Sequence, residues 1–150
     1  SSKTYSEGHK FRHAVVNTCE EKFDHVRRGG TAHAQYQNAG EEYKLNFLKD
    51  FRFAVEVENG FIRGYFTEKI LDCLRTGVIP IYKGDPDILQ HFNPEGIICF
   101  NEVEEVGPIL DSLSEELYQS KLGAVKENYT LAEKYLYPWK HIEEKVRELL

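Results

Sequence analysis

Residues 53–84, which read FAVEVENGFIRGYFTEKILDCLRTGVIPIYKG, decide the fold of this chain. In the first five residues, Phe53 to Val57, apolar and small residues alternate as in a strand, and this pattern stops at the turn cluster of residues 58–60. Thr67 is placed to cap a helix whose apolar residues recur at helical spacing, and Gly77 is placed to end that helix. The pattern therefore predicts a strand, a polar loop and a short helix in succession.

Val78 to Tyr82 reads as a second, buried strand, so the stretch predicts a βαβ unit with a right-handed crossover. In such units ligands gather at the carboxyl ends of the strands. The residues with suitable side chains at that edge are Glu58, Asn59, Tyr65, Thr67, Glu68 and Lys69. We therefore expect a ligand site there.

The rest of the chain extends this unit into an α/β domain. We expect a single domain over residues 1–150, with residues 1–10 as a flexible tail. Phe11 to Asn17 and Ile97 to Phe100 read as further strands, which gives four strands in a Rossmann-like, doubly wound parallel sheet with a helical C-terminal tail. Helices are expected over residues 20–28, 41–50, 85–90, 103–113, 114–128, 131–136 and 139–150.

Composition excludes some classes of partner. With 25 acidic and 19 basic residues the net charge is −6, which argues against a general nucleic-acid binder. No apolar run approaches the about 18 residues of a membrane span, and no signal peptide opens the chain. The cysteines, Cys19, Cys73 and Cys99, form no CxxC pair and are expected to be buried free thiols. We therefore expect a soluble, cytoplasmic protein.

The motifs of residues 58–60 (ENG), 64–70 (GYFTEKI) and 77–86 (GVIPIYKGDP), continued by 91–94 (HFNP), resemble the signature of the α-1,3/4-fucosyltransferases of glycosyltransferase family 10. The similarity is dense from about residue 43 to 101. It implies the C-terminal, donor-binding lobe of a GT-B type glycosyltransferase.

The resemblance implies an enzyme that transfers fucose from GDP-fucose to a glycan hydroxyl, with inversion and without a metal or other cofactor. The donor is a substrate, and the acceptor is a glycan. A carboxylate on an acceptor-binding lobe outside these 150 residues would remove the acceptor proton. That lobe, or a second copy in a homo-oligomer, is the expected protein partner.

Carried over residue by residue, the resemblance points to Asn59, Tyr65, Glu68 and Lys69 as donor-binding residues. The chemistry agrees: the Lys69 ammonium suits a diphosphate, while a carboxylate or an amide suits hydroxyl groups. Thr67 is expected to cap the helix beside them.

Three further candidates follow. Glu58 is the candidate catalytic carboxylate, although a structural role in the turn explains it equally well. The family usually places an arginine that meets phosphate after the asparagine of its first strand, and residues 17–22 offer none. Lys22, Arg27 or Arg28 must then take its place, or the contact is lost. Arg27 and Arg28, before a glycine pair, are candidates for a phosphate clamp, although arginines at a helix C-terminus are favourable in any case.

No metal site is expected. Asp85 and Asp87 resemble a metal-binding DxD, but Asp85 stands before Pro86, as a helix N-cap does.

Other functions remain open at this point. The same scaffold can serve another nucleotide sugar, or bind a nucleotide sugar without catalysis when the acceptor lobe is missing. The tail also holds the aromatic residues Tyr118, Tyr129, Tyr135, Tyr137 and Trp139, which either pack against the domain or bind a partner. Asn128-Tyr129-Thr130 is a glycosylation sequon, which matters only if the chain enters a secretory pathway.

Overall fold

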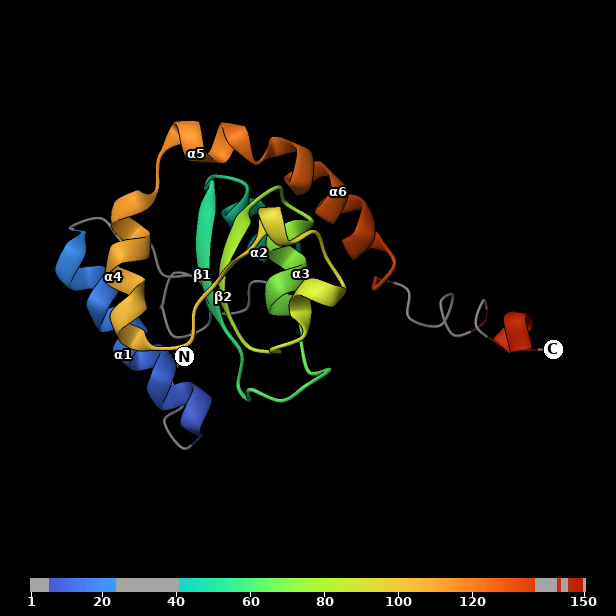
Figure 1. The fold of residues 1–150 in the computed structure, drawn as a ribbon, viewed down its shortest axis with the longest axis horizontal. Helices are drawn as coiled ribbons and strands as arrows, with labels where there is room; N and C mark the ends of the chain where they lie inside the picture. Colours follow the sequence, from blue (N-terminus) through green and yellow to red (C-terminus); the bar gives the residue numbers. More distant parts are fainter. Residues whose placement is uncertain (1–5, 24–40, 137–142, 144–145, 150) are drawn as a thin grey trace.

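The computed structural model describes residues 6–23, 41–136, 143 and 146–149. The described residues form a parallel sheet with helices on both faces (Figure 1). The strands β1 (Phe53–Val57), β2 (Ile79–Lys83) and β3 (Ile98–Cys99) lie in the order β1-β2-β3. The predicted doubly wound, Rossmann-like α/β architecture is confirmed.

The predicted strand over Phe11 to Asn17 is wrong, because these residues belong to the long helix α1 (Glu7–Lys22). The Ser6 side chain caps the helix by accepting a hydrogen bond from the backbone N–H of His9. Val15 and Cys19, four residues apart, are buried along one face of the helix. Residues 1–5 of the predicted tail lie outside the described residues, whereas Glu7 to Lys10 are helical.

Several of the other helices agree with the predicted ones to within a few residues. The helix predicted over 20–28 is wrong in its described part, because α1 ends at Lys22, and residues 24–28 lie outside the described residues. The separate helix predicted over 131–136 is wrong as well, because α6 covers its first half. The helix expected over 114–128 is divided at Lys121, and its second part continues to Glu133. Their bounds are α2 (Glu41–Leu48), α3 (Glu68–Leu74), α4 (Val103–Ser112), α5 (Glu115–Ser120), α6 (Leu122–Glu133), and the 3₁₀ turns η2 (Ile88–Gln90) and η3 (Pro94–Gly96).

Two apolar layers hold the helices to the sheet. Helices α1 and α4 lie side by side on one face, where Val15 and Val106 pack with Ile81 of β2 and Phe100. On the other face Ile70 and Leu74 of α3 pack with Tyr82 of β2 and Ala132 of α6. The successive residues Ile81 and Tyr82 of β2 thus face opposite layers, as the two-residue period of a strand requires.

The cysteines are free, with Cys19 and Cys73 buried as expected and Cys99 exposed, contrary to expectation. The expected helix over 139–150, and with it Tyr137 and Trp139, lies largely outside the described residues. Among the residues that the structure describes, no helix is long and apolar enough to cross a membrane.

Candidate functional site

The predicted site residues gather in the loop that leaves the carboxyl end of β1 and enters α3. In the view of Figure 1 this loop lies below the sheet, whereas α5 lies above its opposite end. Glu58 and Asn59 follow β1 directly, and Thr67 caps α3. Arg27 and Arg28 lie outside the described residues.

Glu58 occupies the centre of this edge. Its side chain is fully buried, and its Oε1 accepts hydrogen bonds from the backbone N–H of Thr67 at 2.9 Å and from the Thr67 hydroxyl at 3.0 Å. Its Oε2 lies 3.3 Å from the Lys69 Nζ. The carboxylate therefore connects β1 to the first turn of α3.

Glycines allow the backbone and side chain of Glu58 to be enclosed so tightly. A Cβ atom on Gly84 would lie 2.6 Å from the Glu58 Cγ and 2.1 Å from the Tyr82 hydroxyl. A Cβ atom on Gly8 of α1 would lie 2.5 Å from the Glu58 carbonyl oxygen. Segments distant in the sequence therefore approach Glu58 closely because these positions carry no side chain.

Lys69 is held by oxygen atoms on several sides. Its Nζ donates to the Thr67 hydroxyl at 2.9 Å and lies 3.3 Å from both Glu58 Oε2 and Glu68 Oε1. The Lys69 side chain is 17% exposed, whereas that of Glu68 is 65% exposed. Burial is the largest influence on the pKa of Glu68 and acts to raise it, but the attraction of Lys69 and Lys44 and the hydrogen bonds from Lys69 and the Glu68 backbone together lower this pKa.

Asn59 and Tyr65 are exposed in the same loop. The Asn59 Oδ1 accepts a hydrogen bond of 2.9 Å from Nη2 of Arg12, which also donates to the Val57 carbonyl oxygen. The structure thus joins Glu58, Thr67, Glu68 and Lys69 by direct contacts. Asn59 follows Glu58 in the chain and binds Arg12.

Arg12 is a candidate site residue that the sequence analysis missed. It lies on α1, and its guanidinium reaches the loop after β1 through Asn59 and Val57. The missed signal was the helical spacing of Phe11, Val15 and Cys19 behind a serine cap, since a strand over this segment would have placed Arg12 elsewhere.

Lys83 is a second such residue, at the carboxyl end of β2. Its Nζ lies 4.8 Å from the centroid of the Phe61 ring and 3.4 Å from the Asn101 Oδ1. Within the described part of the chain, no carboxylate forms an ion pair with either Arg12 or Lys83. Both cations are held by neutral partners and keep their charge available for an anion.

A second carboxyl group lies beneath the site on β1. Removal from water raises the pKa of Glu56 to about 7, against the attraction of Lys44 and Lys69. The thiol of Cys73 on α3 lies 3.8 Å from the Glu56 Oε1. Unlike Glu58, Glu56 accepts no hydrogen bond from a backbone N–H or a hydroxyl among the interactions described here.

The aspartates of the DxD sequence have other partners. Asp85 accepts a hydrogen bond from the backbone N–H of Asp87 at 2.9 Å, and Asp87 pairs with Arg63 at 3.0 Å. These contacts shape the turn that leads to η2. The prediction that Asp85 is the N-cap is wrong, because the 3₁₀ turn begins at Ile88 and its N-cap is Asp87. Among the described residues, no group of three His, Cys, Asp or Glu side chains is arranged to hold a metal ion.

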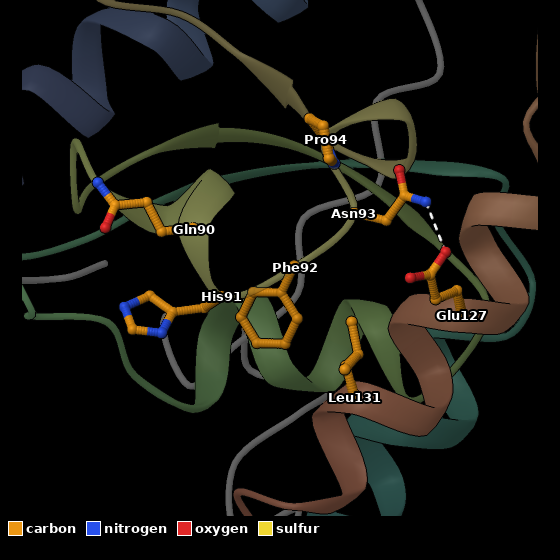
Figure 2. Close-up of a pocket in the computed structure, with 7 residues that line it drawn as sticks. All are labelled: Gln90, His91, Phe92, Asn93, Pro94, Glu127 and Leu131. Atoms are coloured by element: carbon orange, nitrogen blue, oxygen red, sulfur yellow. Dashed lines mark hydrogen bonds between the residues drawn. The ribbon is translucent and has the colours of Figure 1, made fainter.

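A surface hollow of about 370 Å³ lies elsewhere, between the η2–η3 segment and α6 (Figure 2). A hydrogen bond of 2.6 Å joins Asn93 to Glu127 at its edge. The lining residues are Gln90, His91, Phe92, Asn93, Pro94, Glu127 and Leu131. None of the predicted site residues lines it, so it does not locate the predicted site.

The chemistry available at the carboxyl edge suits a phosphorylated, hydroxyl-rich ligand. Lys69, Arg12 and Lys83 supply positive charge for phosphate oxygens. Glu68 and Asn59 can accept hydrogen bonds from hydroxyl groups. The backbone N–H groups of Thr67 and Lys69 are already bound, so the side chains would make these contacts.

Comparison with known proteins points the same way. Residues 3–145 match the family described as glycosyltransferase family 10 (fucosyltransferase), C-terminal part. The chain is 34% identical over 68 residues to an α-(1,3)-fucosyltransferase of Helicobacter pylori, a match that covers 45% of this chain and 14% of that protein. It is 33% identical over 79 residues to α-(1,3)-fucosyltransferase B of Drosophila melanogaster, covering 52% of this chain and 18% of that protein.

A solved structure shares the fold. A crystal structure of an α1,3-fucosyltransferase with GDP-fucose superimposes with a TM-score of 0.64 at 25% identity, over 79% of this chain and 36% of that chain. The chain thus spans less than a fifth of the length of the two curated relatives.

Proposed function

We propose that this chain, which belongs to glycosyltransferase family 10, the fucosyltransferases, binds the nucleotide-sugar donor for fucosyl transfer. The donor would be GDP-fucose, the compound named with the solved relative. The observation that carries the proposal is the anchored Lys69, beside Glu68 and Asn59 at the carboxyl edge of β1.

Each contact has a physical reason. Lys69 would neutralise charge on the diphosphate, and a charge-assisted bond of this kind contributes about 1.5–3 kcal/mol. Glu68 and Asn59 would bind hydroxyl groups, and Tyr65, which is 37% exposed, would offer an aromatic face and a hydroxyl to the nucleoside. Arg12 would fill the place of the family arginine, since it already reaches Asn59; a further contribution from Arg27 and Arg28 stays a prediction.

The proposed reaction is inverting and needs no metal or other cofactor. The acceptor hydroxyl oxygen would form a bond to the anomeric carbon of fucose while the bond from that carbon to the β-phosphate oxygen breaks. A base on the acceptor-binding part of the protein would take the hydroxyl proton. The cationic side chains of this chain would stabilise the departing GDP by neutralising charge on its diphosphate. In that role they would take the place of a metal ion.

Glu58 enters this proposal as the carboxylate that holds Lys69 in place. Direct contact with the sugar would require its buried carboxylate to be uncovered. Its catalytic role therefore stays a prediction, separate from donor binding.

The test is calorimetric titration with GDP, GDP-fucose, UDP and UDP-sugars, with and without a chelator. We expect chelator-insensitive binding that favours the GDP compounds. Lys69→Ala should weaken GDP binding about tenfold or more, whereas Lys126→Ala, at an exposed lysine on α6, should leave it unchanged. Unchanged affinity in Lys69→Ala would contradict the assignment, and a preference for UDP compounds would assign another donor.

A further inference from the structure

The charges around Lys69 do not balance in a way that favours an anion. One ammonium group lies 3.3 Å from two carboxylates, those of Glu58 and Glu68. Within this group one basic side chain thus faces two acidic ones. A diphosphate that approaches Lys69 must therefore compete with a carboxylate that is already there.

The two carboxylates differ in how easily each can move away from Lys69. Glu58 is fully buried and bound to the Thr67 hydroxyl and backbone N–H, so moving it would disrupt the start of α3. The Glu68 side chain is 65% exposed, and Lys69 is the ion-pair partner the structure gives it. Exposed pairs of this kind are weak, because water and salt screen them.

We propose that Glu68 is an exchangeable counter-ion of Lys69 that favours nucleoside diphosphates over free phosphate anions. In the empty site it pairs with Lys69, and it leaves when a diphosphate arrives. A ligand with neighbouring hydroxyl groups gives the displaced carboxylate new hydrogen-bond donors, whereas pyrophosphate gives it none. This inference rests on the proposed function and adds a basis for selectivity within it.

Neutralising Glu68 should therefore have opposite effects on two ligands. Glu68→Gln removes the competing charge, so pyrophosphate should bind about two- to fivefold more tightly. The same change removes a carboxylate acceptor for hydroxyl groups, so GDP should bind about three- to tenfold more weakly. The ratio of the two dissociation constants is the quantity to measure, by NMR or calorimetric titration of the 150-residue chain.

A double-mutant cycle separates ion-pair exchange from general charge repulsion. If Glu68 acts by occupying Lys69, then Glu68→Gln should no longer tighten pyrophosphate binding in the Lys69→Ala background. If the gain in pyrophosphate affinity persists there, Glu68 acts only by repulsion and the proposal is wrong. Glu116→Gln, at an exposed glutamate in the first turn of α5, is the matched control and should change neither affinity.

The outcomes distinguish this inference from the proposed function. If the wild-type chain binds GDP but Glu68→Gln leaves the pyrophosphate affinity unchanged, the exchange is refuted and donor binding stands. If the wild-type chain binds neither ligand, the proposed function fails and this inference fails with it.

Discussion

At the scale of single residues, Glu56 and Glu58 show how two carboxyl groups on adjacent stretches of chain acquire different properties. The carboxylate of Glu58 contacts a hydroxyl, a backbone N–H and an ammonium group. Glu56 lies on β1 with a thiol near it, and removal from water raises its pKa to about 7. The two carboxyl groups thus differ in their contacts, and burial sets the pKa of Glu56.

This difference predicts a pH dependence of stability. Between its ordinary pKa of 4.5 and about 7, Glu56 holds its proton in the folded chain and releases it in the unfolded chain. The free energy of unfolding should therefore fall as pH rises through this window, by about 1–3 kcal/mol from this group. Urea titrations of wild type and Glu56→Gln at pH 5 and pH 8 measure it: the variant should gain relative stability at pH 8, and equal differences at both pH values would contradict the assignment.

Gly84 gives a second prediction at this scale. Gly84→Ala would place a Cβ atom against the Tyr82 hydroxyl and the Glu58 Cγ, which both belong to buried side chains. We expect a loss of about 1–3 kcal/mol in unfolding free energy and weaker GDP binding, because Glu58 must shift. Gly123→Ala is the control, since no atom lies within 4 Å of its added Cβ and the change should not destabilise the chain.

The motif predicted which residues form the site, but not how they are held. Lys69 and Asn59 could be placed at the carboxyl edge because strand, turn and helix signals all lie within 32 neighbouring residues. The burial of Glu58 could not be predicted, because it depends on the close approach of Gly8, 50 positions earlier in the chain. Contacts at such separations leave no local pattern.

At the scale of elements, α1 is the case where local sequence misled. Phe11 to Asn17 has the adjacent valines Val15 and Val16, which favour a strand over a short window. In the structure the segment follows the helical spacing instead, which buries Val15 and Cys19 against α4 and the sheet. The error also concealed Arg12, because its contact with Asn59 follows from the helix.

The attachment of α6 gives a prediction at this scale. The Asn128 side chain is fully buried, accepts a hydrogen bond of 2.6 Å from the Asn93 backbone N–H and donates one of 3.0 Å to the Asn93 carbonyl oxygen. Asn128→Ala should lower the unfolding free energy by about 2–4 kcal/mol, because both backbone groups lose their partner. Glu127→Gln, whose hydrogen bond with Asn93 is exposed, should have a small effect in the same urea titration.

At the scale of the whole molecule, the C-terminal helices close the domain around the sheet. Tyr118 donates a hydrogen bond of 2.9 Å to the Gly77 carbonyl oxygen, and the Tyr135 ring lies 5.2 Å from that of Phe66. Ala132 is fully buried in the layer formed by α3 and β2. For these residues the packing interpretation of the aromatic tail holds, whereas Tyr129 is 46% exposed.

Removal of residues 129–150 should therefore unfold or strongly destabilise the chain. The truncation takes Ala132 and Tyr135 away and uncovers Phe66 and Phe92, a loss of the same kind as large core deletions, which cost about 3–5 kcal/mol. Circular dichroism during thermal unfolding measures this loss. Tyr129→Ala tests the exposed part of the tail and should leave the midpoint nearly unchanged; a truncated chain as stable as wild type would show that the tail does not support the core.

The buried Asn128 also has a consequence for how the protein can be produced. It is the asparagine of a glycosylation sequon, yet its amide is enclosed between α6 and Asn93 and has no room for a glycan. A glycan attached to Asn128 would keep α6 from docking, because the amide could no longer bind the Asn93 backbone. Expression through a eukaryotic secretory route should then yield unmodified folded molecules and modified molecules that fail quality control, and expression in bacteria would avoid the loss.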